Sequence, residues 1–381
     1  MSESIEFRQM IQRGCGLDVH RSEVVATIQG IGIQEETRSF ATFTEDLENL
    51  CSWLLHHQIE TVVMESTGVY WKPVFHVLER HFKVMLVNAR FIKNVPGKKT
   101  DKKDSEWLAK LLLSGLLENS FVPERQIRDL RDLSRYYKKV SGLIVQEKNR
   151  IHKQLQDANI KLSSVISDVF GVSGMRILTC IADGVVDTNS LLSQTNNRLR
   201  ASPEDLRKAL TGHITAHHVF MIRLHLDNIE NYRSIQKELT VQMDAIIQSH
   251  YQDQLRLQTI PGISEHLARN IVAEIGFDMS VFPSQHHLAS WAGVCPGNNQ
   301  SAGKNYSSRA RPGNKALKTT LVEAAWAAVA TKGSEFRKKY HKMIAKMGKK
   351  KALFAIAHKI LLTVYVVLDR KVNYQPKPFY V

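Results

Sequence analysis

The spacing of apolar residues changes near Pro123, and this change constrains the fold more than any other feature of the chain. Before it, short β-branched runs alternate with stretches of helical spacing. After it, apolar residues recur every three or four positions among many charged residues, which is typical of long helices. We therefore expect an α/β region followed by all-α regions, and 381 residues suffice for two or three domains.

The region before Pro123 has the order of elements that is typical of a mixed sheet. The expected elements are two strands around a polar turn in 13–30, a strand at 38–43, a helix at 45–57, a strand at 59–64, a helix at 71–81 and a strand at 83–87. Three consecutive strands favour antiparallel pairing, and the helix–strand alternation after them favours parallel pairing. We expect one α/β domain over 1–125.

Two long helical patterns dominate the middle of the chain. Residues 130–151 and 222–246 carry apolar side chains at three- and four-residue steps, which form the narrow seam of a coiled coil. Between them, Ser202 followed by Pro203 and two acidic residues is a typical helix start. We expect a helical coiled-coil domain over 126–250.

The last region, 251–381, opens with two helical patterns joined by the sequence TIPGIS. This arrangement predicts a helix-hairpin-helix, in which hairpin amides and a helix N-terminus meet a phosphate. A plain helical hairpin that packs on its neighbours is the alternative. We expect a third, mainly helical domain here.

Positive charge is concentrated in this last region. Residues 302–381 hold 18 basic and 3 acidic residues, so the whole net charge of +15 lies there. Such a segment favours a polyanion partner, because each phosphate that Lys or Arg neutralises releases counterions. The basic residues are interleaved with Gly, Pro, Ser and Asn in KNYSSRARPGNK rather than arranged on one amphipathic helix, which favours nucleic acid over a membrane surface.

The composition argues against several other classes of protein. The four cysteines are widely spaced without a CxxC pair, so neither a zinc ribbon nor a disulfide scaffold is indicated. The longest apolar run, Ile360 to Leu368, is shorter than the roughly 18 residues that span a bilayer. The polar N-terminal sequence lacks the apolar core of a signal peptide. We expect a cytoplasmic protein with no membrane partner.

Four acidic residues stand at positions where carboxylates could bind metal. Asp18 lies inside the first strand, Glu65 ends the strand TVVME, and Asp101 and Asp104 share one face at the start of a helix. A carboxylate in a buried strand costs several kcal/mol unless it is paired or bound to metal. Such hard oxygen ligands suit Mg²⁺, one or two ions of which could act on a phosphodiester. Alternatively, the helix acids complement the helix dipole and Glu65 caps a turn.

Ser301, within CPGNNQSAGKNYSSRARPGNKALK, is a candidate nucleophile. Its small neighbours let the backbone approach a ligand, although its hydroxyl needs a base or a metal for activation. Basic residues that could hold phosphates follow it: Lys304, Arg309, Arg311, Lys315 and Lys318. A Gly-x-Ser-x-Gly elbow is missing, which argues against an esterase. An ordinary loop serine is the alternative.

Together these blocks resemble the DEDD insertion-sequence transposases of the IS110/IS1111 group, described as bridge-RNA-guided serine recombinases. The N-terminal resemblance rests on GLDVH, VVMESTGVYW and KTDKKDSEWLA, which contain the four acids. The C-terminal resemblance rests on TIPGIS, LASWAGVCPGNNQSAGK and RARPGNKALKTTLVEAAW. It covers nearly the whole chain. Ala302 stands where the family often has Gly, which is the one visible departure.

The resemblance implies a RuvC-like RNase H fold that binds Mg²⁺, with Mn²⁺ as the alternative ion, through Asp18, Glu65, Asp101 and Asp104. It implies a coiled-coil middle and a transposase domain whose Ser301 attacks a DNA phosphodiester to form a covalent phosphoserine link. The implied partners are donor and target DNA, a noncoding bridge RNA, and further copies of the chain in a dimer or tetramer. The implied location is the bacterial cytoplasm, in association with the nucleoid.

Three other classes stay open. A RuvC-like nuclease or junction resolvase would hydrolyse DNA with the acids alone and form no covalent intermediate. An actin-like ATPase or sugar kinase also opens with a sequence like GLDVH and a hairpin, but this chain offers no convincing second Gly-rich phosphate loop. A non-enzymatic nucleic-acid-binding protein would use the basic segment and leave Asp18 unexplained.

Overall fold

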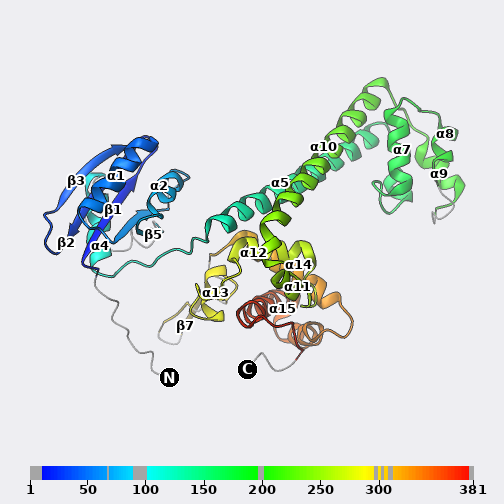
Figure 1. Ribbon diagram of the computed structural model, residues 1–381. Helices are drawn as coiled ribbons and strands as arrows, with labels where there is room; N and C mark the ends of the chain where they lie inside the picture. The colour runs from blue at the N-terminus through cyan, green and yellow to red at the C-terminus, as the bar shows by residue number, and fades with distance from the viewer. Residues whose placement is uncertain are drawn as a thin grey trace. The chain divides into compact units, whose positions relative to one another are not determined.

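The structure is a computed structural model of the chain (Figure 1). It describes residues 11–66, 68–88, 101–195, 201–295, 299–301, 304–307 and 312–376, of which 101–103, 299–301 and 304–307 are described by their backbone alone. The chain divides into two compact units, Met1–Val122 and Pro123–Val381. The three-domain division at 125 and 250 stays a prediction.

A five-stranded sheet forms the centre of the first unit. Its strands are β1 (Arg13–Val19), β2 (Glu23–Gly30), β3 (Glu36–Ala41), β4 (Thr61–Glu65) and β5 (Lys83–Val87). They are arranged in the order β3-β2-β1-β4-β5, with β1, β2 and β3 antiparallel and β4 and β5 parallel to β1. The predicted mixed sheet is confirmed, and it is compatible with an RNase H-like fold.

Helices cover both faces of this sheet. They are α1 (Thr44–His56), α2 (Trp71–Leu78) and α4 (Asp101–Leu113). Val62 of β4 packs in one core with Leu54 of α1 and Phe75 of α2, whereas the next residue, Val63, packs in another core with Leu108 of α4. Successive strand residues face opposite sides of a sheet, so α4 covers the face opposite α1 and α2. Burial on both faces explains the unbroken apolar run in β4.

Helix α4 lies against β1 at Gly16, where only a glycine leaves enough room. A Cβ at Gly16 would lie 2.1 Å from the Ser105 carbonyl oxygen and 2.5 Å from the Ala109 nitrogen. Beside this contact, Ser105 Oγ lies 2.7 Å from Thr27 Oγ1 in a buried hydrogen bond. Gly16 and Asp18 share one face of β1, because they are two residues apart. The close contact therefore holds the first turns of α4 over the face of the sheet that carries Asp18.

Two long helices form an arm in the second unit, as Figure 1 shows. They are α5 (Arg125–Asp157) and α10 (Ala216–Ile247), and they pack against each other along their length. Short helices lie at the far end of the arm: α6 (Leu162–Val165), α7 (Val172–Ala182), α8 (Thr188–Ser193) and α9 (Pro203–Leu210). The two long helices and the Ser202 cap, whose hydroxyl accepts from Asp205 N at 3.1 Å, are confirmed. Coiled-coil geometry stays a prediction.

The other end of the arm joins a helical body. It consists of a 3-10 turn (Gln248–His250), α11 (Tyr251–Gln258), α12 (Glu265–Ile275), α13 (Gln285–Ala292), β6 (Asn299–Ser301), β7 (Lys304–Ser307), α14 (Lys315–Ala330) and α15 (Glu335–Arg370). Gly262 lies in the turn between α11 and α12 with a φ of +90°, and a Cβ there would lie 2.4 Å from the Ala324 carbonyl oxygen of α14. The turn therefore packs on α14 inside the unit. Its function as a phosphate-binding helix-hairpin-helix stays a prediction.

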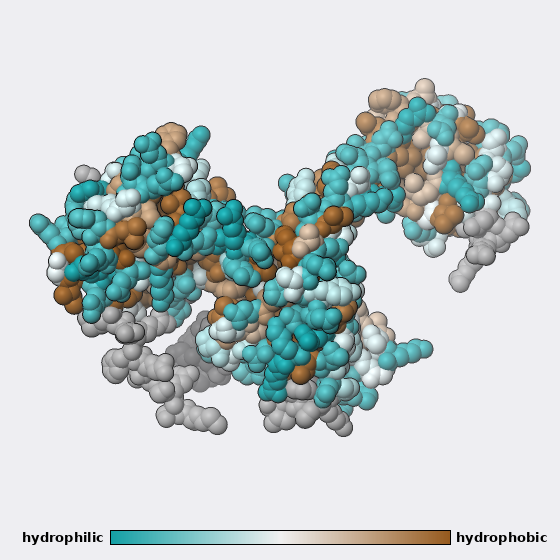
Figure 2. Space-filling view, viewed as in Figure 1, coloured by the Kyte–Doolittle hydropathy of each residue, from teal (hydrophilic) through white to brown (hydrophobic). Residues whose placement is uncertain are grey.

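Helix α15 supplies much of the core of this body. Within the described residues it is the one helix long and apolar enough to cross a membrane, and 56% of its most apolar window is buried inside the structure. Gly348 interrupts the helical backbone with a φ of 77°, and most of the buried apolar residues of α15 follow this kink. Exposed lysines precede and flank the kink, and Figure 2 shows hydrophilic side chains over much of the visible surface. Half-buried apolar character of this kind is typical of a core helix.

Candidate functional site

Three of the four predicted acidic residues converge on the α4 side of the first unit's sheet. The parallel register pairs Leu17 with Met64, so Asp18 and Glu65 are the next residues along two neighbouring strands. Asp104 lies in the first turn of α4, which the contact at Gly16 holds against β1. Both Asp104 and Glu65 act electrostatically on Asp18. We call these three carboxylates the acid site.

The environment of Asp18 disfavours its charged form. Burial is the main cause that raises the pKa of this carboxyl above its ordinary value, and the negative charges of Asp104 and Glu65 raise it further. His20 opposes the rise through a contact of 3.0 Å between its Nε2 and Asp18 Oδ2. A bound divalent cation would remove the repulsion between the carboxylates, so the donor set suits a hard metal ion.

The described side chains alone do not make a complete metal site. Among the described side chains, the three carboxylates of the acid site are near one another but are not arranged so that they could hold one metal ion together, and neither is any other group of three or more His, Cys, Asp or Glu residues. The side chain of Asp101 lies outside the described residues, although its backbone begins α4 one turn before Asp104. Asp101 as a fourth ligand therefore stays a prediction.

An open cavity of about 420 Å³ gives a ligand access to Asp18. Its lining also includes His20, Glu23, Arg38 and Glu106. Arg38 donates to Glu36 at 2.6 Å, and both side chains are partly exposed. The cavity therefore offers groups of both signs to a ligand beside the acid site. Sequence reasoning did not single out Glu106, although it stands two residues after Asp104.

The backbone places Ser301 on a short hairpin in the second unit. Strands β6 and β7 pair antiparallel, and Ser301 is opposite Lys304 in their register. Ser301 is the last residue of β6, so it stands directly before the turn of the hairpin. The side chains of Ser301 and Lys304, and the whole of Arg309 and Arg311, lie outside the described residues. Their predicted roles stay predictions.

The two remaining predicted phosphate ligands lie in the first turn of α14. Asn314 caps this helix, because its Oδ1 accepts from Leu317 N at 3.0 Å. Lys315 is exposed, whereas Lys318 is partly buried, and that burial lowers the pKa of its ammonium group. Lys315 therefore presents a solvent-accessible positive charge at a helix N-terminus, where backbone N–H groups also favour anions.

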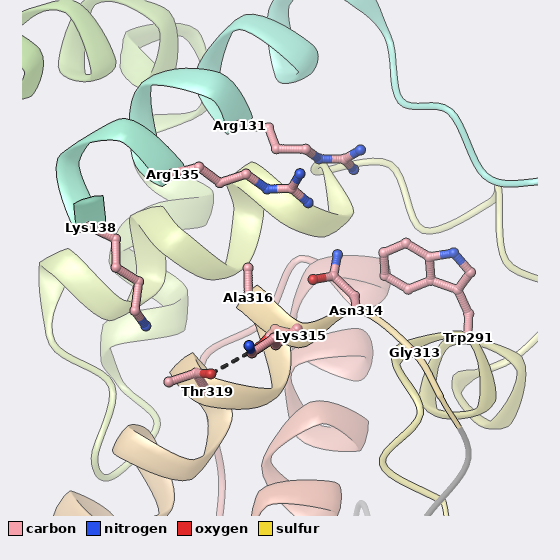
Figure 3. A pocket seen from close by; sticks show the side chains of 9 residues that line it. All are labelled: Arg131, Arg135, Lys138, Trp291, Gly313, Asn314, Lys315, Ala316 and Thr319. Atoms are coloured by element: carbon pink, nitrogen blue, oxygen red, sulfur yellow. Dashed lines mark hydrogen bonds between the residues drawn. The ribbon is translucent and has the colours of Figure 1, made fainter. Parts of the chain in front are cut away.

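The structure adds basic residues that the sequence analysis did not single out (Figure 3). Arg131, Arg135 and Lys138 of α5 line a cavity of about 650 Å³ together with Trp291 of α13 and the start of α14, including Lys315. We call this the basic cavity. The three α5 residues follow the spacing i, i+4, i+7, which places them on one face of a helix and is visible in the sequence. Their convergence with Lys315 depends on helix packing.

Two family models match separate stretches of the chain. A DEDD transposase family model of the IS110 type, described as "Transposase", matches residues 15–160, which contain the acid site. The model described as "Transposase IS116/IS110/IS902 family" matches residues 254–341, which contain Ser301 and Lys315.

Curated relatives match the chain almost from end to end. Pilin gene-inverting proteins from Moraxella lacunata and from Moraxella bovis are each 24% identical to it over 380 residues, which cover 96% of both chains in each comparison. Two models of one transposase family thus match in the expected order: the first spans the acid site and the α5 residues of the basic cavity, and the second spans Lys315 of that cavity. The chain belongs to the IS110 family of transposases, enzymes that recombine DNA.

Proposed function

We propose that this transposase cuts and rejoins DNA with Ser301 as the nucleophile and with metal held by Asp18, Glu65, Asp101 and Asp104. The observation that carries the proposal is the convergence of Asp18, Glu65 and Asp104 on one side of a sheet, where Asp104 and Glu65 each disfavour the charged form of Asp18. A cluster of this kind costs free energy in the folded protein unless a ligand compensates for it. Sites with such a cost are commonly functional.

The carboxylates would hold Mg²⁺, with Mn²⁺ as the alternative ion. Bound there, the metal would stabilise negative charge that develops on the oxygens of a phosphodiester. Asp18 and Glu65 are held by neighbouring strands, and α4 brings Asp104 to them through its contact with Gly16. These rigid elements keep the ligands in place, which metal-assisted phosphoryl transfer requires.

In the proposed reaction, Ser301 Oγ forms a bond to a backbone phosphorus as its proton leaves to a base. The bond from that phosphorus to the departing 3′ oxygen breaks, and this oxygen takes up a proton to become a free 3′-hydroxyl. The 3′-hydroxyl of another strand then attacks the phosphoserine, which reseals DNA and restores the serine hydroxyl. One phosphoester bond replaces another in each step, so no external energy source is needed.

The proposal includes the partners that such a reaction requires. Donor and target DNA are the substrates, and a structured noncoding bridge RNA selects them by base pairing. The acid site of one copy faces Ser301 of another copy in a dimer or tetramer. The basic C-terminal segment contacts nucleic-acid backbone, in keeping with its excess of Lys and Arg.

The test is a search for DNA that is covalently attached to protein. Purified protein is incubated with labelled donor and target DNA, RNA transcribed from the element's ends, and Mg²⁺, and the products are separated on a denaturing gel. We expect an adduct that disappears with Ser301→Ala and with Asp101→Ala. Ser307→Ala is the matched control, because Ser307 lies on the second strand of the same hairpin.

Other outcomes identify what is wrong. Free cleavage products with an active Ser301→Ala variant would exclude the serine nucleophile and favour the RuvC-like nuclease or junction resolvase, which needs the acids alone. An adduct that forms equally well without RNA would exclude guidance by the RNA. An adduct that persists in EDTA would exclude the metal.

A further inference from the structure

The basic cavity collects positive charge from parts of the chain that are far apart in sequence. Arg131, Arg135 and Lys138 come from α5, and Lys315 comes from α14. Figure 3 shows Arg131 and Arg135 reaching from α5 toward Asn314 and Trp291, on the side where the cavity lies. Four cations beside one open cavity repel one another, so the fold must compensate for them or a ligand must do so.

The fold compensates for the two arginines. The side chain of Glu274, only 3% exposed, accepts from Arg135 Nε at 2.8 Å and from Arg135 Nη2 at 2.9 Å. Arg131 Nε lies 3.3 Å from the same carboxylate, and Arg131 Nη2 donates to the Glu274 carbonyl oxygen at 2.7 Å. Asn314 Nδ2 also donates to Glu274, at 2.6 Å. The arginines thus join α5, α12 and the start of α14 into a rigid wall.

The two lysines have no comparable buried partner among the described contacts. Lys138 lies 3.3 Å from Glu323, but both side chains are nearly half exposed, and such surface pairs contribute little. Lys315 is exposed at the rim of the cavity. Two carboxylates therefore contact three of the four cations, and the cavity keeps an excess of positive charge in a rigid frame. An anion that fits the cavity would neutralise this excess charge and accept hydrogen bonds from the lysines.

The position of the basic cavity indicates where that anion comes from. The segment that carries the β6–β7 hairpin leaves α13 next to Trp291 and returns at Gly313, and both of these residues line the cavity. A Cβ at Gly313 would lie 2.5 Å from the Ala292 carbonyl oxygen, so the two ends of the segment are in direct contact. The cavity therefore lies where the two ends of the segment that carries Ser301 meet.

We propose that the basic cavity binds a backbone phosphate of the DNA strand that Ser301 attacks, at a position beside the scissile phosphate. This inference rests on the proposed function, because that function makes DNA the ligand of the hairpin. Lys138 and Lys315 are the phosphate ligands. Arg131 and Arg135 hold α5, α12 and the start of α14 together through Glu274, and they add positive electrostatic potential to the cavity. The indole of Trp291 forms an apolar wall suited to a sugar or a base edge. The contact positions the strand and reads no base sequence.

The test measures how salt weakens the binding of full-length protein to a short fluorescent DNA duplex of fixed sequence. The double variant Lys138→Gln/Lys315→Gln removes two charges and leaves the buried Glu274 network in place. Lys153→Gln/Lys332→Gln is the matched control, because it removes two exposed lysines elsewhere in the same unit. Single-stranded DNA and duplex RNA are measured in parallel, and each single lysine variant is measured as well.

We expect the slope of log affinity against log salt concentration to become shallower by about 1 for each lysine–phosphate interaction that the variant removes. Affinity at moderate salt should fall about tenfold, since the variant cannot form the charge-assisted hydrogen bonds to phosphate. The control variant should keep the wild-type slope. Equal slopes for the two double variants would overturn the inference, and so would a loss of affinity that is confined to RNA.

The gel assay for covalent adduct separates this inference from the proposed function. If the wild-type protein forms the adduct and the Lys138→Gln/Lys315→Gln variant binds and reacts like the control, the inference fails while the proposed function stands. If the salt slope falls as expected but Ser301→Ala still cleaves DNA, the phosphate site stands and the serine mechanism fails. Thermal melting of both double variants confirms that they are folded.

Discussion

The acid site and the basic cavity carry opposite charges, and the fold treats the two differently. At the acid site, burial and the charges of Asp104 and Glu65 raise the pKa of Asp18, and His20 Nε2 lies 3.0 Å from Asp18 Oδ2. In the basic cavity, the buried carboxylate of Glu274 neutralises much of the charge in advance. The metal that we propose would balance the negative charge of the acid site, whereas the basic cavity is already rigid and holds a smaller excess of charge for a ligand.

The largest expected effect is the loss of DNA cleavage in Asp18→Asn. Removal of a metal ligand should lower the rate by on the order of 10³-fold or more, because the metal then supplies several kcal/mol less charge stabilisation. Asp227→Asn is the matched control, because Asp227 lies on the exposed surface of α10. Cleavage is measured on a denaturing gel, and equal rates for the two variants would remove Asp18 from the metal site.

In EDTA, the melting temperature of the Asp18→Asn variant should be no lower than that of the wild type. The pKa of Asp18 is raised in the folded protein, so the folded state binds more protons than the unfolded chain between the two pKa values. The free energy of unfolding therefore falls as the pH rises through that window and Asp18 ionises. The Asn side chain does not ionise, so the Asp18→Asn variant avoids this fall in stability. Mg²⁺ should raise the melting temperature of the wild type and of Asp227→Asn but not of Asp18→Asn. A clear drop in the EDTA melting temperature of Asp18→Asn would mean that its charge is compensated in the free protein.

The next largest effect is a loss of stability when the buried Glu274 carboxylate beside the basic cavity is removed. Glu274→Gln leaves two guanidinium groups without a buried counter-charge, and we expect the free energy of unfolding of the second unit to fall by about 3–5 kcal/mol. Glu323→Gln is the control, because its exposed pair with Lys138 should contribute less than about 1 kcal/mol. Urea unfolding followed by circular dichroism gives both values. Similar values for the two variants would show that Glu274 does not hold the frame.

A smaller effect is expected where α4 approaches the sheet. Gly16→Ala places a Cβ within 2.1 Å of the Ser105 carbonyl oxygen, so α4 must move away from β1 at a cost of about 1–3 kcal/mol. Because the shift moves Asp104 relative to Asp18, cleavage should fall more than stability does. Stability is measured by urea unfolding and cleavage by the gel assay, both under conditions where the variant stays folded. Unchanged cleavage would show that the position of α4 does not matter for the acid site.

The smallest effect should appear in α5, one helical turn beyond Lys138. Gly142 lies inside α5, and a Cβ there would meet nothing within 4 Å. Gly142→Ala should therefore raise the free energy of unfolding by about 0.5–1 kcal/mol, the usual gain from replacing glycine in a helix. DNA binding and cleavage should not change. A loss of stability would mean that another molecule packs against this face of α5 in solution.

Local patterns in the sequence were sufficient to predict most of the elements. The strands around Asp18, the two long helices and the Ser202 cap follow from the spacing of side chains over short stretches, and the structure has each of them. Alternation of apolar residues and capping act between near neighbours in the chain, so they are visible without a structure. The four acids and Ser301 were also marked by sequence, through their positions in the expected elements and through the family resemblance.

Only the tertiary structure decided which of these residues meet. The approach of α4 at Gly16 brings Asp104 toward Asp18, and the packing of both α5 and α14 on α12 brings Arg131 and Lys138 to the cavity beside Lys315. The sequence spacing of the α5 residues shows that they share a helix face, but it does not show what that face contacts. Such contacts join residues that are far apart in the chain, and they depend on the packing of whole elements rather than on any local pattern.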